Sequence, residues 1–250
     1  LCVVPHQELH TLPFAALSLG GAQSLIDRYA IYYSPSASVL RYTIARRANR
    51  GAEAKTLAVG NPNLGSAQFN LPFAQKEAER LQFDLPNVTV RTGSDATESW
   101  LVKNLQDYGI IHIASHGQYN PDQPLFSAVE LAPDNVNDGH LTSNEVFGLQ
   151  LRADLIALSA CQSGLGRVSK GDDIVGLNRA FVYAGTRQLM TTLWRVDDIS
   201  TAILFKYVYR NMRDTDRAEA VRQAQIRLKN RPEYKHPAHW AGLVLSGDWE

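Results

Sequence analysis

A histidine and a cysteine, each placed where an apolar segment ends, are the residues of this chain best suited to chemistry. His116 follows the apolar run 108–114, and Cys161 follows the apolar run 153–160. Both runs predict buried β-strands, and side chains at the carboxyl ends of strands in open α/β sheets face the crevice where ligands bind. A histidine that accepts the proton of a nearby thiol generates a thiolate, the nucleophilic form of cysteine. Together the two residues predict nucleophilic catalysis by a Cys-His dyad.

Taken singly, each residue has an ordinary structural explanation. A cysteine on an apolar strand is usually a small buried hydrophobic group, and a disulfide between Cys2 and Cys161 stays open as an alternative. A histidine near a strand is usually a hydrogen-bonded polar group. The presence of His116 and Cys161 at two strand ends, each followed by a glycine-bearing turn, favours catalysis. His112 lies inside its apolar run, so we expect it to be a hydrogen-bonded core residue.

The spacing of the two residues is close to that of caspases. Cys161 lies 45 residues after His116, and in caspases the histidine precedes the cysteine by about 50 residues. Ser159 stands where caspases have Gln. The chain resembles the CHAT peptidases, caspase-like domains that usually follow tetratricopeptide repeats and are related to separase. The resemblance extends over nearly the whole chain, through segments 5–17, 113–117, 158–164, 171–173, 179–185, 193–198 and 237–241.

The resemblance implies a fold and a mechanism. The fold would be a caspase-like three-layer α/β sandwich formed by residues 1–250 as one domain of a longer protein with repeats upstream. The function would be that of a cysteine endopeptidase acting on protein or peptide substrates without a cofactor or metal. Cys161 would attack the scissile carbonyl, and His116 would protonate the leaving amine. The backbone N–H groups of Gly117 and Cys161 would stabilise the oxyanion. No residue is marked by its position as an orienter of His116.

The resemblance also implies where a substrate would bind. Caspase-like folds add an extended peptide to a strand edge, here at Leu193 and Trp194. Asp198, or Asp197 beside it, would then receive a basic side chain, as an acidic residue after a similarly placed Leu-Trp does in separase. Either aspartate could instead cap the helix expected from residue 201. A second acidic pair, 172–173, could line the pocket or cap the next helix, and Trp194 could fill the core.

Along the chain, segments whose apolar pattern is typical of a strand alternate with segments whose apolar pattern is typical of a helix. This predicts a mostly parallel sheet covered by helices on both faces. We expect strands at 29–33, 56–59, 88–91, 109–114, 155–159 and 188–193. We expect helices at 38–47, 73–81, 98–105, 175–184, 201–213 and 217–229, a short helix opened by a capping box at Thr142, and a hairpin joining 128–132 to 140–141.

Composition excludes several classes of protein. The chain of 250 residues has 25 acidic and 25 basic side chains, so charge gives no argument for nucleic acid or an anionic membrane. No apolar run approaches the ~20 residues of a membrane span, and no signal peptide is visible. Two cysteines cannot form a disulfide framework, so we expect a cytoplasmic protein. His236 and His239 have zinc-ligand spacing, but the intervening Pro237 favours a packing role.

Two other functions stay open. The domain could be a catalytically silent scaffold that keeps a caspase-like fold for regulated association, or a cysteine hydrolase of a small ester or amide. For a peptidase we expect regulation by the upstream repeats or a protein partner. Loop 162–176 contains four glycines and few apolar anchors, so we expect it to be displaced in the isolated domain, which would then be weakly active or latent.

Overall fold

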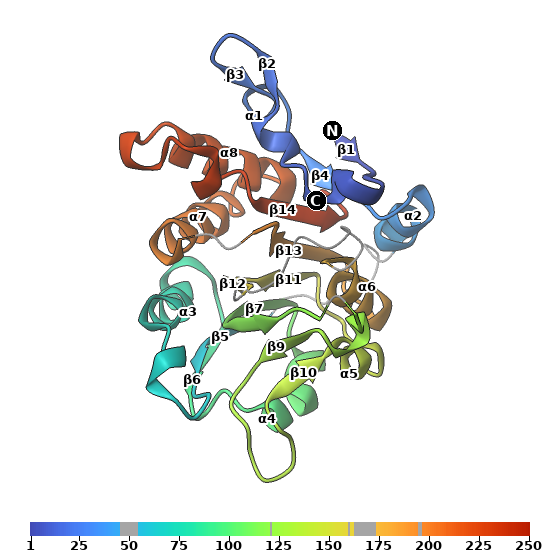
Figure 1. The fold of residues 1–250 in the computed structure, drawn as a ribbon, viewed down its shortest axis with the longest axis vertical. Coiled ribbons are helices and arrows are strands. Elements are labelled where there is room, and N and C mark those ends of the chain that lie inside the picture. The colour runs from blue at the N-terminus through green and yellow to red at the C-terminus, as the bar shows by residue number, and fades with distance from the viewer. Residues whose placement is uncertain (46–54, 121, 160, 163–173, 195–196) are drawn as a thin grey trace.

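The centre of the computed structural model is an eight-stranded sheet (Figure 1). The structure describes residues 1–45, 55–120, 122–159, 161–162, 174–194 and 197–250. Neighbouring strands of this sheet run parallel, except for the antiparallel pair β13 and β14. In order across the sheet the strands are β1 (Cys2–Val3), β4 (Tyr32–Tyr33), β14 (Leu243–Gly247), β13 (Gln188–Thr192), β11 (Leu155–Leu158), β7 (Ile110–Ala114), β5 (Thr56–Pro62) and β6 (Val88–Gly93).

Helices cover both faces of the sheet. On one side of Figure 1 lie α3 (Pro72–Asp84), α7 (Asp198–Asn211) and α8 (Arg217–Lys229). The opposite side carries α2 (Ala37–Ala45), α5 (Ser143–Phe147) and α6 (Ile174–Ala184), with α4 (Glu98–Asn104) near β6. Several of these helices are capped at the N-terminus by a side chain that accepts a backbone hydrogen bond. For example, the Asp216 carboxylate accepts the Glu219 N–H and so satisfies a backbone donor at the start of α8.

Two apolar clusters hold the layers together, one on each face. Successive side chains of a strand point to opposite faces, and in β5 this alternation is visible residue by residue. Leu57 and Val59 pack with side chains of α4, α5 and α6, whereas Ala58 between them packs with α3, α7 and α8. Both clusters are buried, so the strands are apolar on both faces, as parallel strands between helix layers must be.

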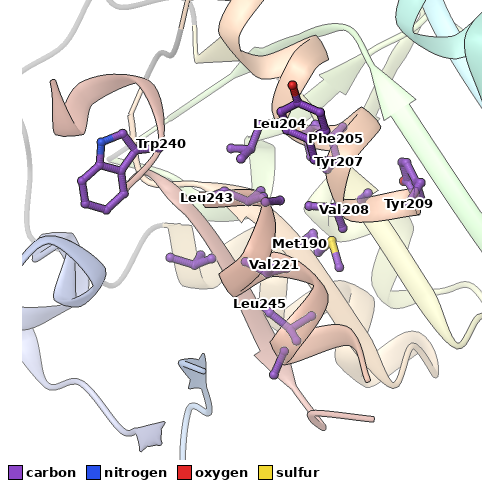
Figure 2. Close-up of a cluster of buried hydrophobic side chains, with 14 of the residues drawn as sticks. Met190, Leu204, Phe205, Tyr207, Val208, Tyr209, Val221, Trp240, Leu243 and Leu245 are labelled. Carbon is purple, nitrogen blue, oxygen red and sulfur yellow. The ribbon is translucent and has the colours of Figure 1, made fainter. Parts of the chain in front are cut away.

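Figure 2 shows part of the cluster under α7 and α8. Met190 of β13 and Leu245 of β14 lie beneath Phe205 and Val208 of α7 and Val221 of α8. These side chains are almost completely shielded from solvent. Burying each is worth ~1.5–3 kcal/mol, so the C-terminal helices are held by their apolar faces on the sheet.

His112 of β7 lies in the same layer. Its Nδ1 is 2.9 Å from the hydroxyl oxygen of Tyr209, and its Nε2 is 3.0 Å from Oε1 of Glu77 without hydrogen-bond geometry. The imidazole is fully buried, and its ring contacts Phe205 and Tyr209 edge-on. Burial raises the pKa of Tyr209 well above its usual value, with the Glu77 charge adding to the effect. The predicted core role of His112 is confirmed.

A second, four-stranded sheet lies beyond the carboxyl ends of β7 and β11. Its order is β10 (His140–Thr142), β9 (Ala128–Glu130), β8 (His116–Gln118) and β12 (Cys161–Gln162). The predicted hairpin is the antiparallel pair β9 and β10. The predicted capping box is also present, since Thr142 and Glu145 bond reciprocally at the start of α5. A separate hairpin of β2 (Ser18–Gly20) and β3 (Gln23–Ser24) precedes the one-turn helix α1 (Leu25–Arg28).

The fold class predicted from the sequence is confirmed: the protein is a mixed α/β sandwich with a mostly parallel sheet between helices. All six predicted strands and all six longer helices are present, with shifts of a few residues at their ends. Helix α7 begins at Asp198 rather than near residue 201, because Asp197 caps it. The sequence patterns did not reveal β14 or the pairing of β8 with β12.

Candidate active site

His116 and Cys161 are partners in one β-ladder. The parallel strands β8 and β12 pair Cys161 with His116 and Gln162 with Gly117. Strands β11 and β7 immediately before them pair Leu158 with Ile113, at the same offset of 45 residues. The pairing offset between β7 and β11 in the main sheet is therefore kept between β8 and β12 in the small sheet. The backbones of the two candidate catalytic residues are thereby brought to adjacent positions.

The backbone carbonyl of Phe69 orients the imidazole of His116. Nε2 of His116 lies 2.9 Å from the Phe69 oxygen, and the two rings meet edge-on with centroids 5.8 Å apart. A carbonyl oxygen can only accept a hydrogen bond, so Nε2 must carry the proton. In the neutral ring the lone pair is then on Nδ1, which is the atom able to accept a proton from a thiol.

This orienter was not predictable from the sequence, because every residue type has a backbone carbonyl. Phe69 lies in the loop between β5 and α3, and the side chain of Asn61, near the end of β5, bonds the residues that follow Phe69. Its amide donates to Asn70 at 2.7 Å, and its oxygen accepts the Leu71 N–H at 2.7 Å. Asn61 has a positive φ of 49°, which asparagine tolerates better than most residues. The Asn61 side chain thus ties the end of β5 to the two residues that follow Phe69.

Gly117, the first predicted oxyanion donor, lies in the middle of the small sheet. It pairs with Val129 of β9 on one side and with Gln162 of β12 on the other. The second predicted donor, the backbone of Cys161, is in β12 next to His116. Most of the loop after Cys161, with the acidic pair 172–173, lies outside the described residues. The displacement expected for loop 162–176 therefore stays a prediction.

Leu193 and Trp194 form a bend that follows the last residue of β13. The Leu193 N–H donates to the Gly242 carbonyl at 2.8 Å, on the β14 side. Successive residues of a strand point their N–H groups to opposite sides, so the N–H group of Thr192, the last residue of β13, faces the side of β11, which ends at Leu158. This is the edge at which a peptide could pair.

The indole of Trp194 packs against the segment before β14. Its Nε1–H donates to the Ala238 carbonyl at 3.0 Å. A Cβ added to Gly242 would lie 2.8 Å from the indole Cε2, so the ring requires a glycine at that position. The side chain of Trp194 is thus fixed by packing, while its backbone lies beside the open edge.

The two aspartates after this segment have different surroundings. The Asp197 carboxylate accepts the Ser200 N–H at 2.9 Å and caps α7, which is the structural role that the sequence left open for it. Asp198 is the half-buried first residue of α7. The contact of Asp198 with a substrate stays a prediction.

His236 and His239, which share a zinc-like spacing, make local contacts instead. Nδ1 of His236 accepts the Ala238 N–H at 3.2 Å, and the His239 ring packs edge-on against Tyr234. Within the described part of the chain, no three His, Cys, Asp or Glu side chains are grouped as metal ligands would be. Cys2, in the edge strand β1, has a free thiol.

Comparison with known families decides the classification. The CHAT domain matches residues 1–248, nearly the whole chain. The chain belongs to the CHAT domain family. Among curated proteins, this CHAT domain is similar to tetratricopeptide repeat protein 28 of Homo sapiens, with 23% identity over 299 residues, and of Mus musculus, with 25% identity over 300 residues. The match covers 99% of this chain but 12% of each relative, so the CHAT domain spans about an eighth of their length.

Solved structures of caspase-like cysteine peptidases share the fold. The separase–securin complex of Saccharomyces cerevisiae superposes with a TM-score of 0.63 at 16% identity, over 96% of the CHAT domain and 15% of that chain. The Arg-specific cysteine proteinase gingipain R superposes with a TM-score of 0.58 at 9% identity, over 94% of the domain and 57% of that chain. At these identities the likeness concerns the fold. Among the described residues, every helix is too short or too polar to traverse a lipid bilayer.

Proposed function

We propose that this CHAT domain is a cysteine endopeptidase that cleaves protein substrates through Cys161 and His116. The observation that carries the proposal is the ladder pairing of Cys161 with His116. It puts the two residue types of a thiol nucleophile and its base side by side. The Phe69 carbonyl adds a second argument, since it directs the proton of His116 to Nε2 and leaves Nδ1 as the basic atom.

The proposed reaction has two stages. In the first, Nδ1 of His116 takes the thiol proton, and the Cys161 thiolate attacks the scissile carbonyl. Backbone N–H groups of Gly117 and Cys161 stabilise the oxyanion, and His116 returns the proton to the amine that leaves. In the second, His116 takes a proton from water, the resulting hydroxide attacks the thioester, and the thiol leaves with that proton. The peptide is thus hydrolysed, and the dyad returns to its starting state.

The substrate in this proposal is an extended peptide that pairs along Thr192 and the Leu193–Trp194 segment after it. Main-chain hydrogen bonds at a strand edge hold a peptide in register without regard to sequence. Asp198 at the start of α7 would receive an Arg or Lys side chain at P1, the residue before the scissile bond. A buried cation requires a carboxylate partner, and Asp198, four residues after Trp194 in the sequence, is the first residue of α7.

We further propose that the domain works in the cytoplasm, under the control of an upstream repeat domain or a protein partner. The relatives that carry a similar domain are named for tetratricopeptide repeats. The similar fold of separase was solved in a complex with securin. Both observations fit a caspase-like domain whose activity depends on other chain segments or proteins.

Labelling with a series of peptidyl acyloxymethylketones, which alkylate a catalytic thiolate, tests the proposal. The unmodified protein should be labelled at Cys161, with the fastest labelling by probes with Arg or Lys at P1. The Cys161→Ala variant is the matched control and should not be labelled, although it retains Cys2. If no probe labels Cys161, even when the upstream repeat domain or the protein partner is present, the proposed peptidase function is excluded.

One observation favours a second function, a silent scaffold. The similar repeat proteins are named for their repeats rather than for a reaction. A scaffold would bind its partner equally well with Cys161 or His116 replaced by alanine, whereas a peptidase would bind but no longer cleave. Partner binding together with absent cleavage in the unmodified protein would select the scaffold.

A further inference from the structure

We propose that a hollow beside Phe69 binds the first residue after the scissile bond, and that it favours an uncharged side chain there. The inference rests on the peptidase function proposed above and adds a specificity to it. The hollow has a volume of about 370 Å³. It lies at the carboxyl ends of β5 and β6 and is lined by residues 61–67, 69, 70, 93 and 94.

The order of strands determines which part of a substrate reaches this hollow. Across the sheet, β13 is followed by β11, β7, β5 and β6. At their carboxyl ends these strands lead in turn to the pairing edge at Trp194, to Cys161, to His116 and to the hollow. A peptide that pairs at Trp194 and meets Cys161 at its scissile carbonyl must therefore continue past His116 toward the hollow.

The chemistry of His116 leads to the same side. The imidazole protonates the leaving amine, so the nitrogen of the first residue after the scissile bond must come within hydrogen-bond reach of the ring. Phe69 both bonds and contacts this ring and is itself part of the wall of the hollow. A side chain attached next to the leaving nitrogen therefore has the hollow as its neighbour.

The lining of the hollow is uncharged. Its apolar members are Pro62, Leu64, Ala67 and Phe69, and its polar members are asparagines and serines. Of these, Asn63 bridges to Ser94 at 3.2 Å and accepts the Gly65 N–H at 3.0 Å, so its amide already serves to fix the loop. A charged side chain entering here would lose part of its hydration without meeting an opposite charge among these residues. An uncharged side chain would not incur this cost.

Two variants at one position test the inference. Ala67 lines the hollow and is exposed, so Ala67→Asp and Ala67→Lys introduce opposite charges without disturbing the core. Gln68 is the exposed next residue and does not line the hollow, so Gln68→Asp and Gln68→Lys are matched controls. Internally quenched peptides with a fixed sequence before the scissile bond and Ala, Glu or Lys after it give kcat/KM for each variant.

The unmodified protein should cleave the Ala peptide fastest. Ala67→Asp should raise the Lys-to-Glu ratio of kcat/KM by about two- to fivefold, and Ala67→Lys should lower it by a similar factor, as expected for one solvent-accessible charge pair. The Gln68 variants should leave the ratio unchanged. The ranking of residues before the scissile bond, measured with coumarin amides that share one leaving group, should be the same in all five proteins.

The outcomes separate the two proposals. Cleavage of peptides with no opposite shift between the Ala67 variants overturns the binding inference and leaves the peptidase function intact. Equal shifts in the Gln68 variants also overturn it, because the effect would then come from general surface charge. If the unmodified protein cleaves no peptide and no coumarin amide, the peptidase function fails and the inference fails with it.

Discussion

Nε2 of His116 lies 2.9 Å from the backbone carbonyl oxygen of Phe69, a residue 47 positions earlier in the chain. A catalytic imidazole needs a partner that fixes both its orientation and the position of its proton. In many hydrolases a carboxylate has this role. Here the partner is a neutral carbonyl, which directs the proton to Nε2 without placing a negative charge beside the ring.

This contact predicts the protonation state of the ring. In neutral His116, Nε2 should be protonated and Nδ1 should not. Nitrogen NMR of labelled histidine, with the His116 signals assigned by comparison with His116→Ala, measures both atoms directly. A resting state with the proton on Nδ1 would contradict the orientation and would exclude Nδ1 as the base.

Replacement of either member of the dyad should abolish turnover. Cys161→Ala removes the nucleophile, and His116→Ala removes the base. Since catalytic groups that act together are not additive, the double variant should be no slower than either single variant. Peptide cleavage rates measure the effect, and circular dichroism of each variant checks that the fold is retained. Appreciable activity in Cys161→Ala would refute its assignment as nucleophile.

Asp198 and Asp197 should respond differently to substitution. Asp198→Ala should lower kcat/KM for substrates with Arg or Lys at P1 by more than tenfold, because loss of one partner of a buried ion pair costs ~2–5 kcal/mol. Asp197→Ala should instead lower the free energy of unfolding by about 1 kcal/mol, since it removes the cap of α7. A P1 library and a urea titration measure the two effects. An unchanged P1 ranking in Asp198→Ala would exclude the pocket.

The buried contact of Glu77 with His112 should contribute to stability. Glu77→Ala leaves the fully buried imidazole without this neighbour and should lower the free energy of unfolding by about 1–3 kcal/mol. Glu79, two residues along the same helix, is exposed, and Glu79→Ala should change stability by no more than ~0.5 kcal/mol. Urea unfolding of both variants makes the comparison. Equal stabilities would show that Glu77 contributes nothing through His112.

The main sheet and its helices were predictable because their signals are local. Each apolar run such as 108–114 is long enough to identify one strand, and the alternation of strands with helices then determines the class of fold. The equal offset of the two pairs, Leu158 with Ile113 and Cys161 with His116, is also implicit in the sequence. This offset of 45 residues is the His116–Cys161 spacing that resembles the spacing in caspases.

Other features depend on contacts that sequence patterns do not encode. Strand β14 is a short apolar segment after two helices, and its antiparallel place beside β13 is set by packing against α8. Every residue type has a backbone carbonyl, so the type of residue 69 does not indicate that its carbonyl contacts His116. Only the path of the loop after β5 reveals this role. Asp197 and Asp198 are adjacent and chemically identical, and only the start of α7 distinguishes the cap from its neighbour.

Strand β14 has a consequence for the order in which the domain can assemble. In the sheet it lies between β13 and β4, and through it the β1–β4 pair from the start of the chain joins the rest. Among the described strands it is the last that a ribosome produces. During synthesis β1 and β4, the two strands of this sheet that are made first, must therefore wait for it, with the edge of β4 that pairs with β14 unfilled. Completion of the sheet is thus a late event that links the two ends of the domain in a single step.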